Sequence, residues 1–84
     1  MANVTIYTTL LCPYCHSAKR LLKEKDIAYS EIDVTFDPPG RRKMAELAGK
    51  TSVPQIFIGE THVGGCDELY ALDNAGELVE LLES

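Results

Sequence analysis

The sequence has few cysteines, few basic residues and no long apolar segment. Three cysteines are too few, and an odd number, for the disulfide framework of a small secreted domain. No apolar run is long enough to cross a membrane, and residues 1–9 lack the charged and apolar regions of a signal peptide. With 8 Lys and Arg against 13 Asp and Glu, the net charge of −5 argues against a general nucleic-acid-binding surface. We therefore expect a cytoplasmic protein in a reducing compartment, with neither a membrane nor a nucleic acid as its partner.

The length and composition are those of a small globular protein. A chain of 84 residues fits one domain, which we expect to extend over residues 1–84. Apolar residues make up 45% of the chain and charged residues 25%, so the chain can bury one modest core.

The first part of the chain has the pattern of a strand, a helix and a second strand. Residues 3–8 alternate apolar and polar side chains and are rich in β-formers, which predicts a strand. Residues 14–25 carry apolar residues at helical spacing, and Pro13 suits the first turn of that helix. Residues 28–34 predict a second strand. The short connections indicate a right-handed parallel βαβ unit.

The rest of the chain predicts a helix, a hairpin and a helical C-terminal segment. Asp37 is a suitable N-cap and Gly49 a suitable stop for the helix between them. Residues 54–58 and 61–63 predict two strands, joined by a tight two-residue turn that begins with glycine. Residues 64–82 predict one helix or two, with the break at Asn-Ala-Gly if there are two. The order βαβαββα predicts an α/β fold in which helices flank a four-stranded mixed sheet.

The sequence CPYCH at residues 12–16 is compatible with three kinds of chemistry. Cys12 and Cys15 could anchor a haem with His16 as its axial ligand, but that attachment is typical of exported proteins. Cys12, Cys15, His62 and Cys66 could bind zinc tetrahedrally. Against zinc, the first cysteine pair straddles a helix start, and the apolar stripes that follow can build the fold without metal. The third alternative is a redox dithiol.

The position of the two cysteines favours the redox dithiol. A strand leads directly into a helix, so the first helical N–H groups and the positive end of the helix dipole should favour the Cys12 thiolate. Cys15 lies one turn later on the same face, within reach of the Cys12 sulfur, and should be less exposed. Lys19, one turn further, should add a small electrostatic attraction. Cys12 is therefore the predicted nucleophile and Cys15 the predicted resolving thiol.

Three motifs together resemble the glutaredoxin family, in particular its small bacterial dithiol members. They are CPYC at residues 12–15, TSVPQIFI at 51–58 and GGCDEL at 64–69. The resemblance covers essentially the whole chain and implies a thioredoxin-like fold. It implies reduction of protein disulfides and protein–glutathione mixed disulfides, with glutathione as cosubstrate and no bound cofactor or metal. We expect a monomer, and the resemblance suggests ribonucleotide reductase as one protein substrate.

The resemblance also implies which residues contact glutathione: Tyr14, Arg41, Val53, Pro54, Gly65, Cys66 and Asp67. In the family, the proline that matches Pro54 is cis and faces the dithiol, which leaves the Val53 backbone to pair with the extended tripeptide. The N–H groups of Cys66 and Asp67 would bind the γ-glutamyl carboxylate, and the Asp67 side chain its ammonium. Arg41 would bind the glycine carboxylate.

Two residues and two alternative functions stay open at this point. Many relatives have lysine where this chain has Thr9, so we expect weaker glutathione binding and a less stabilised thiolate here. Cys66 should pack at a helix start or, if exposed, undergo glutathionylation or disulfide formation. The alternative functions are a thioredoxin-like protein reduced by a flavoprotein reductase, and a dimer that holds an iron–sulfur cluster with glutathione.

Overall fold

The computed structural model describes residues 2–83 and shows eight helices and strands within this range. In chain order they are β1 (Val4–Thr8), α1 (Pro13–Glu24), β2 (Ser30–Asp33), α2 (Pro38–Ala48), β3 (Gln55–Ile58), β4 (Thr61–Gly64), α3 (Cys66–Asn74) and α4 (Leu78–Glu83). The C-terminal segment thus forms two helices, separated at Asn-Ala-Gly, where Gly76 has a φ of 73°. The other predicted elements are present with small shifts of their ends.

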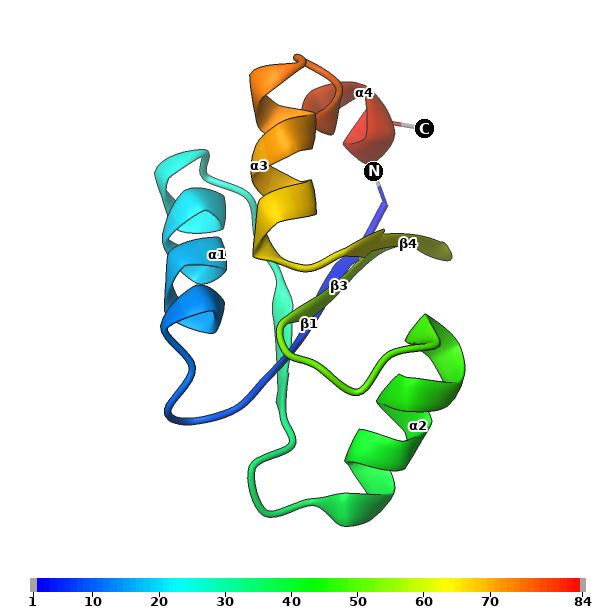
Figure 1. The fold of residues 1–84 in the computed structure, drawn as a ribbon. Helices are drawn as coiled ribbons and strands as arrows, with labels where there is room; N and C mark the ends of the chain where they lie inside the picture. Colours follow the sequence, from blue (N-terminus) through cyan, green and yellow to red (C-terminus); the bar gives the residue numbers. More distant parts are fainter. Residues whose placement is uncertain (1, 84) are drawn as a thin grey trace.

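The four strands form one mixed sheet in the order β2-β1-β3-β4. β1 pairs with β2 in parallel, with Thr8 opposite Asp33. It pairs with β3 antiparallel, with Ile6 opposite Ile56, and β3 and β4 form an antiparallel hairpin. Figure 1 shows α1 and α3 on one side of the sheet and α2 on the other. The predicted thioredoxin-like architecture is confirmed.

Local sequence signals mark the ends of α2 and the turn of the hairpin. The Asp37 carboxylate caps α2 by accepting a hydrogen bond from the Gly40 N–H at 3.1 Å. Gly49 ends the same helix with a φ of 71°, a left-handed conformation that glycine adopts without steric cost. Gly59 has a φ of 60° in the hairpin turn, so the turn predicted between the last two strands is confirmed as well.

Apolar residues are buried on both faces of the sheet. On one face, Val4 and Ile6 of β1 pack with Leu22 of α1 and Leu69 of α3. On the other face, a smaller cluster consists of Tyr7, Val34 and Met44, with Val53 and Phe57 packed against it. Burial of one such aliphatic side chain contributes about 1.5–3 kcal/mol. Because side chains alternate along β1, this one strand connects the α1–α3 layer to the α2 layer.

The strand predicted over residues 28–34 is shorter in the structure. β2 extends only over Ser30–Asp33, and all four of its residues are exposed. β2 is an edge strand that pairs with β1 alone, so its length is set by the hydrogen bonds that it makes with β1. Val34 follows it and is buried against α2, which directs the chain to that layer. None of the helices within residues 2–83 is long and apolar enough to cross a membrane.

Candidate functional site

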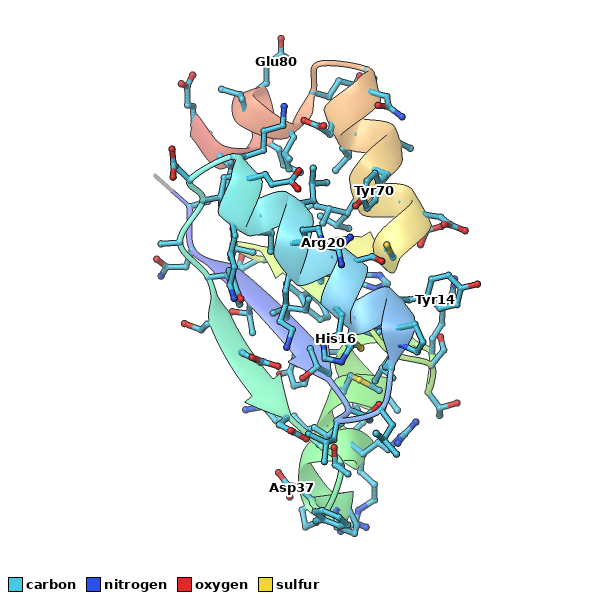
Figure 2. All side chains as sticks on the ribbon, turned by 90° about the vertical axis from the view of Figure 1, so that its left-hand side faces the viewer. Tyr14, His16, Arg20, Asp37, Tyr70 and Glu80 are labelled. Atoms are coloured by element: carbon cyan, nitrogen blue, oxygen red, sulfur yellow. The ribbon has the colours of Figure 1, made fainter. Side chains whose placement is uncertain are left out.

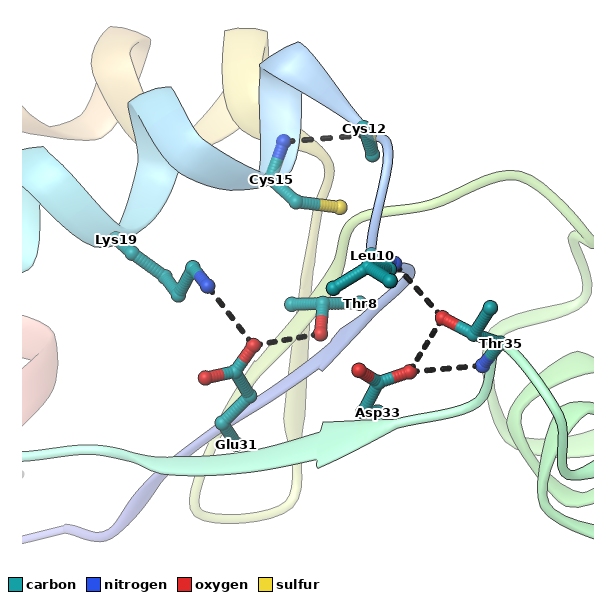
Figure 3. Close-up of polar contacts among 8 residues, drawn as sticks. All are labelled: Thr8, Leu10, Cys12, Cys15, Lys19, Glu31, Asp33 and Thr35. Carbon is teal, nitrogen blue, oxygen red and sulfur yellow. Dashed lines mark hydrogen bonds and ion pairs between the residues drawn. The ribbon is translucent and has the colours of Figure 1, made fainter.

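Cys12 is the N-cap of α1, with an extended backbone at φ −109° and ψ 108°. Its sulfur accepts a hydrogen bond from the Cys15 N–H at 3.3 Å (Figure 3). Its thiol donates to the Val53 carbonyl oxygen at 3.6 Å. The helix start therefore directs an N–H group and the positive end of the dipole at this sulfur, as the sequence predicted. Pro13 occupies the first turn and contributes no N–H of its own.

Cys15 lies one turn into α1 and differs from Cys12 in burial. Its exposed fraction is 0%, against 9% for Cys12, and both thiols are reduced. Burial, and next the hydrogen bond with Cys12, raises the pKa of Cys15 to about 12. A backbone hydrogen bond from Thr9 and the charge of Lys19 act in the opposite direction. Cys15 is therefore protonated in the resting dithiol, and Cys12 is the thiol in position to attack.

A surface pocket lies between the start of α1, the loop before β3 and the start of α3, and Cys12 contacts it through its hydrogen bond to Val53. Its lining includes Tyr14, Val53, Pro54, Gly65, Cys66 and Asp67, six of the seven residues predicted as glutathione contacts. The Val53–Pro54 peptide bond is cis, as the resemblance implied. Tyr14 is 63% exposed and projects outward from the first turn of α1 (Figure 2). The fold thus gathers residues from three separate parts of the sequence.

Arg41, the seventh predicted contact, is not among the residues that line this pocket. Its guanidinium donates from Nη2 to the Thr51 carbonyl oxygen at 3.1 Å. Arg41 therefore connects α2 to the loop that leads to Val53. Lys50 lines the pocket, so a basic side chain other than Arg41 is present there.

Sequence reasoning also missed Ser52, Gln55 and Glu68, which line the same pocket. Gln55 is 2% exposed and donates from Nε2 to the Ser52 carbonyl oxygen at 3.0 Å. Its Oε1 lies 2.7 Å from Nε2 of His62, so it connects the loop before β3 to the hairpin. Position in the motifs TSVPQIFI and GGCDEL was a signal that could have identified all three residues.

The start of α3 forms the other end of the pocket. The Gly65 N–H donates to Oε1 of Glu68 at 2.6 Å, so this carboxylate caps the helix. Cys66 is 8% exposed and belongs to the main core cluster. Burial first, and then the charge of Asp67, raises the pKa of the Cys66 thiol. The structure therefore supports the packing role for the Cys66 side chain, while its backbone N–H lies in the first turn of the helix.

The described residues show none of the ligand clusters that a metal ion would need. Within residues 2–83, no group of three or more His, Cys, Asp or Glu side chains could hold a metal ion. His62, one of the four considered for zinc, is hydrogen bonded to Gln55. His16 is exposed on α1 (Figure 2), as expected for a polar residue of the first helical turn.

The fold and the dithiol together define a class of protein. A thioredoxin-like sheet carries a Cys-x-x-Cys pair at a strand-to-helix junction, with the first sulfur at the cap and the second buried one turn later. This arrangement is that of a thiol–disulfide oxidoreductase, since one thiol can attack a disulfide and the other can resolve the product.

Comparison with known proteins identifies the family. The family model described as Glutaredoxin matches residues 4–63. A glutaredoxin from Pseudomonas aeruginosa is 54% identical over 84 residues, with both chains covered completely. The solution structure of glutaredoxin from Brucella melitensis matches with a TM-score of 0.86 and 51% identity, covering 98% of this chain and 89% of that one. The buckwheat glutaredoxin–glutathione complex matches with a TM-score of 0.88 and 27% identity, covering 98% and 77%. The chain belongs to the glutaredoxin family.

Proposed function

We propose that this protein reduces protein disulfides and protein–glutathione mixed disulfides with glutathione as its cosubstrate. The main support is the position of the Cys12 sulfur, which lies at the start of α1 and in hydrogen-bond contact with Val53 of the adjacent pocket. A structurally similar glutaredoxin forms a complex with glutathione, which supports the same ligand for this pocket.

The pocket offers a partner for each polar end of glutathione. The α3 N-terminus can bind the γ-glutamyl carboxylate through the N–H groups of Cys66 and Asp67. The exposed Asp67 carboxylate can bind the ammonium of the same residue. The Val53 backbone can pair with the peptide in extended conformation. Lys50, from the segment between α2 and β3, is the cation we assign to the glycine carboxylate.

The reaction needs no bound cofactor or metal. The Cys12 thiolate attacks the glutathione sulfur of a protein–glutathione mixed disulfide, and the protein thiolate leaves and takes a proton. A second glutathione thiolate then attacks the glutathione sulfur on Cys12, which yields oxidised glutathione and restores the Cys12 thiolate. With a protein disulfide, Cys12 forms the mixed disulfide with the protein and Cys15 displaces it. Two glutathione molecules then reduce the Cys12–Cys15 disulfide.

The proposal is tested with the Cys15→Ser variant, which cannot resolve a mixed disulfide. After incubation with oxidised glutathione, intact-protein and peptide mass spectrometry should find one glutathione on Cys12. A matched Cys15→Ser/Cys66→Ser variant should give the same adduct, because Cys66 is buried and its pKa is raised by burial. A missing adduct at Cys12, or an adduct on Cys66 alone, would contradict the proposed function.

We extend the proposal to a cytoplasmic monomer that acts on several disulfide-containing proteins, ribonucleotide reductase among them. The low cysteine content supports a reducing compartment. The same Cys15→Ser variant, immobilised and exposed to a cell lysate, should retain substrates as mixed disulfides. A Cys12→Ser/Cys15→Ser variant is the matched control and should retain none of them.

A further inference from the structure

The proposed dithiol route depends on a thiol that the fold disfavours as a nucleophile. Cys15 must attack a mixed disulfide on Cys12, and the attacking species is the thiolate. Cys15 has an exposed fraction of 0%, and burial raises its pKa to about 12. Burial leaves few water molecules to solvate the negative charge that develops there. A nearby positive group that is held in place would therefore accelerate this step.

Lys19 is such a group. It follows Cys15 by four residues on α1, so the two side chains lie on the same face of the helix. Figure 3 shows both side chains leaving α1 on the side that faces Thr8 and Glu31. The Lys19 side chain is only 19% exposed, and its Nζ lies 2.9 Å from Oε2 of Glu31. The ammonium is thus near Cys15 and not extended into solvent.

Two strands hold Lys19 in this position. Glu31 extends from the edge strand β2, and its Oε2 accepts hydrogen bonds from both Lys19 and the Thr8 hydroxyl (Figure 3). Thr8 is fully buried at the end of β1, and the distance from its Oγ1 to Glu31 Oε2 is 2.7 Å. These bonds connect α1 to β1 and β2 directly below the dithiol. We call the side chains of Thr8, Lys19 and Glu31 the α1 clamp.

The charged groups around Cys15 show in which direction Lys19 changes its pKa. Burial and then the neighbouring Cys12 raise the pKa of Cys15, and a backbone hydrogen bond from Thr9 and the charge of Lys19 lower it. Glu31, Tyr29 and Cys15 act on Lys19 in turn, and Lys19 acts on Asp33. Glu31 offsets part of the lysine charge, yet the ammonium is the positive group that Cys15 faces. Asp33 is itself occupied by hydrogen bonds from the Thr35 N–H and hydroxyl.

We propose that Lys19, held by the α1 clamp, is a positioning residue for the resolving step and stabilises Cys15 as its thiolate forms. The inference rests on the proposed function. In this step Cys15 gives its proton to solvent, and its sulfur forms a bond with the Cys12 sulfur. The bond between Cys12 and glutathione breaks, and glutathione leaves as a thiolate that takes a proton. The Cys15 sulfur is oxidised, and the glutathione sulfur is reduced.

The test separates the two chemical steps by rapid mixing of reduced protein with oxidised glutathione. Acid quenching and mass spectrometry follow first the glutathione adduct on Cys12 and then its loss as the Cys12–Cys15 disulfide forms. In Lys19→Met, we expect adduct formation on Cys12 to slow only slightly, because Lys19 lies one helical turn further from Cys12 than from Cys15. Resolution should slow about fivefold at neutral pH. The rise of the resolution rate with pH should move to higher pH. Lys19→Arg should restore the wild-type rate, because it keeps the charge.

Two controls distinguish this role from a structural one. Lys25→Met removes an ion pair at the C-terminal cap of α1, between Lys25 Nζ and Asp73 Oδ1 at 3.3 Å, and should change neither step. In the Cys15→Ser background, Lys19→Met should change the rate of adduct formation on Cys12 by much less than the fivefold expected for resolution. If Lys19→Met does not fold, as judged by circular dichroism, Lys19→Gln replaces it.

Results that contradict the role of Lys19 differ from results that contradict the proposed function. Equal slowing of both steps, unchanged resolution, or failure of Lys19→Arg to restore the rate would each overturn the inference and leave the proposed function standing. Absence of any glutathione adduct on Cys12 in the wild type and in Cys15→Ser would overturn the proposed function itself.

Discussion

Replacement of Lys50 by methionine tests which cation binds the glycine carboxylate of glutathione. Lys50 lines the pocket and comes directly after Gly49, the residue that ends α2. The guanidinium of Arg41 is bonded to the carbonyl oxygen of Thr51 at 3.1 Å. We therefore expect Lys50→Met to weaken glutathione binding more than Arg41→Met does.

The magnitude follows from the exposure of Lys50. An ion pair between exposed groups contributes about 0.2–1 kcal/mol, and 1 kcal/mol corresponds to about a fivefold change in affinity. Lys50 is exposed, so KM for a glutathione mixed disulfide should rise by up to about fivefold. The kcat value should change little, because the glycine end of the ligand is remote from the reacting sulfur. The difference should shrink at about 1 M salt, where the Debye length falls to about 3 Å.

The assay is steady-state deglutathionylation of a small glutathione mixed disulfide at low and high ionic strength. Lys23→Met is the matched control, since it removes an exposed lysine from the last turn of α1 and should leave KM unchanged. A rise in KM for Arg41→Met together with an unchanged KM for Lys50→Met would refute the assignment of Lys50.

Three further predictions concern single residues. Thr9→Lys should increase glutathione affinity by up to about fivefold and speed alkylation of the nucleophilic thiol below neutral pH; if both stay unchanged, the expectation about the missing lysine is wrong. Asp37→Ala removes the cap of the Gly40 N–H and should cost about 1 kcal/mol, a fall in Tm of about 4–8 °C that Asp37→Asn largely avoids. The pKa of Glu31 is held below its ordinary 4.5, first by its hydrogen bond with Lys19. The ionised Glu31 side chain therefore stabilises the folded protein above the unfolded pKa, and this contribution is lost as pH falls through the lower folded pKa. Glu31→Gln should therefore lower the free energy of unfolding by under about 1 kcal/mol at pH 7. In urea unfolding, the difference between wild type and variant should become smaller below about pH 4.5. A difference that does not depend on pH would exclude this ion pair as its source.

Much of the fold could be predicted because its signals are local. Asp37 caps α2 through a hydrogen bond to a residue three positions away, and Gly49 ends that helix through its own backbone conformation. Gly59 forms the hairpin turn in the same way. Such contacts lie within a few residues of one another, so the sequence shows them directly. The length of β2 was less predictable, because an edge strand depends on its pairing with β1.

In the candidate site, too, the local features were predictable and the features that depend on tertiary packing were not. The difference between Cys12 and Cys15 follows from one helical turn, and the burial of Cys15 was expected from that spacing. The predicted role of Arg41 was transferred from the resemblance alone. Which long, flexible cation lines the pocket depends on how the end of α2 packs against the loop before β3. For that reason Lys50 became evident only in the structure.

The sequence by itself determined the chemistry of this protein. A dithiol at a strand-to-helix junction, with one cysteine at the cap and one a turn inside, is encoded in the pattern of residues 3–25. Only the tertiary structure decided the surroundings of that dithiol. Val53 contacts the Cys12 thiol across 41 positions of sequence, and Glu31 holds Lys19 near Cys15 from a different strand. Electrostatic and hydrogen-bond partners act over a few ångströms in space, and chain folding alone brings such distant residues within that range.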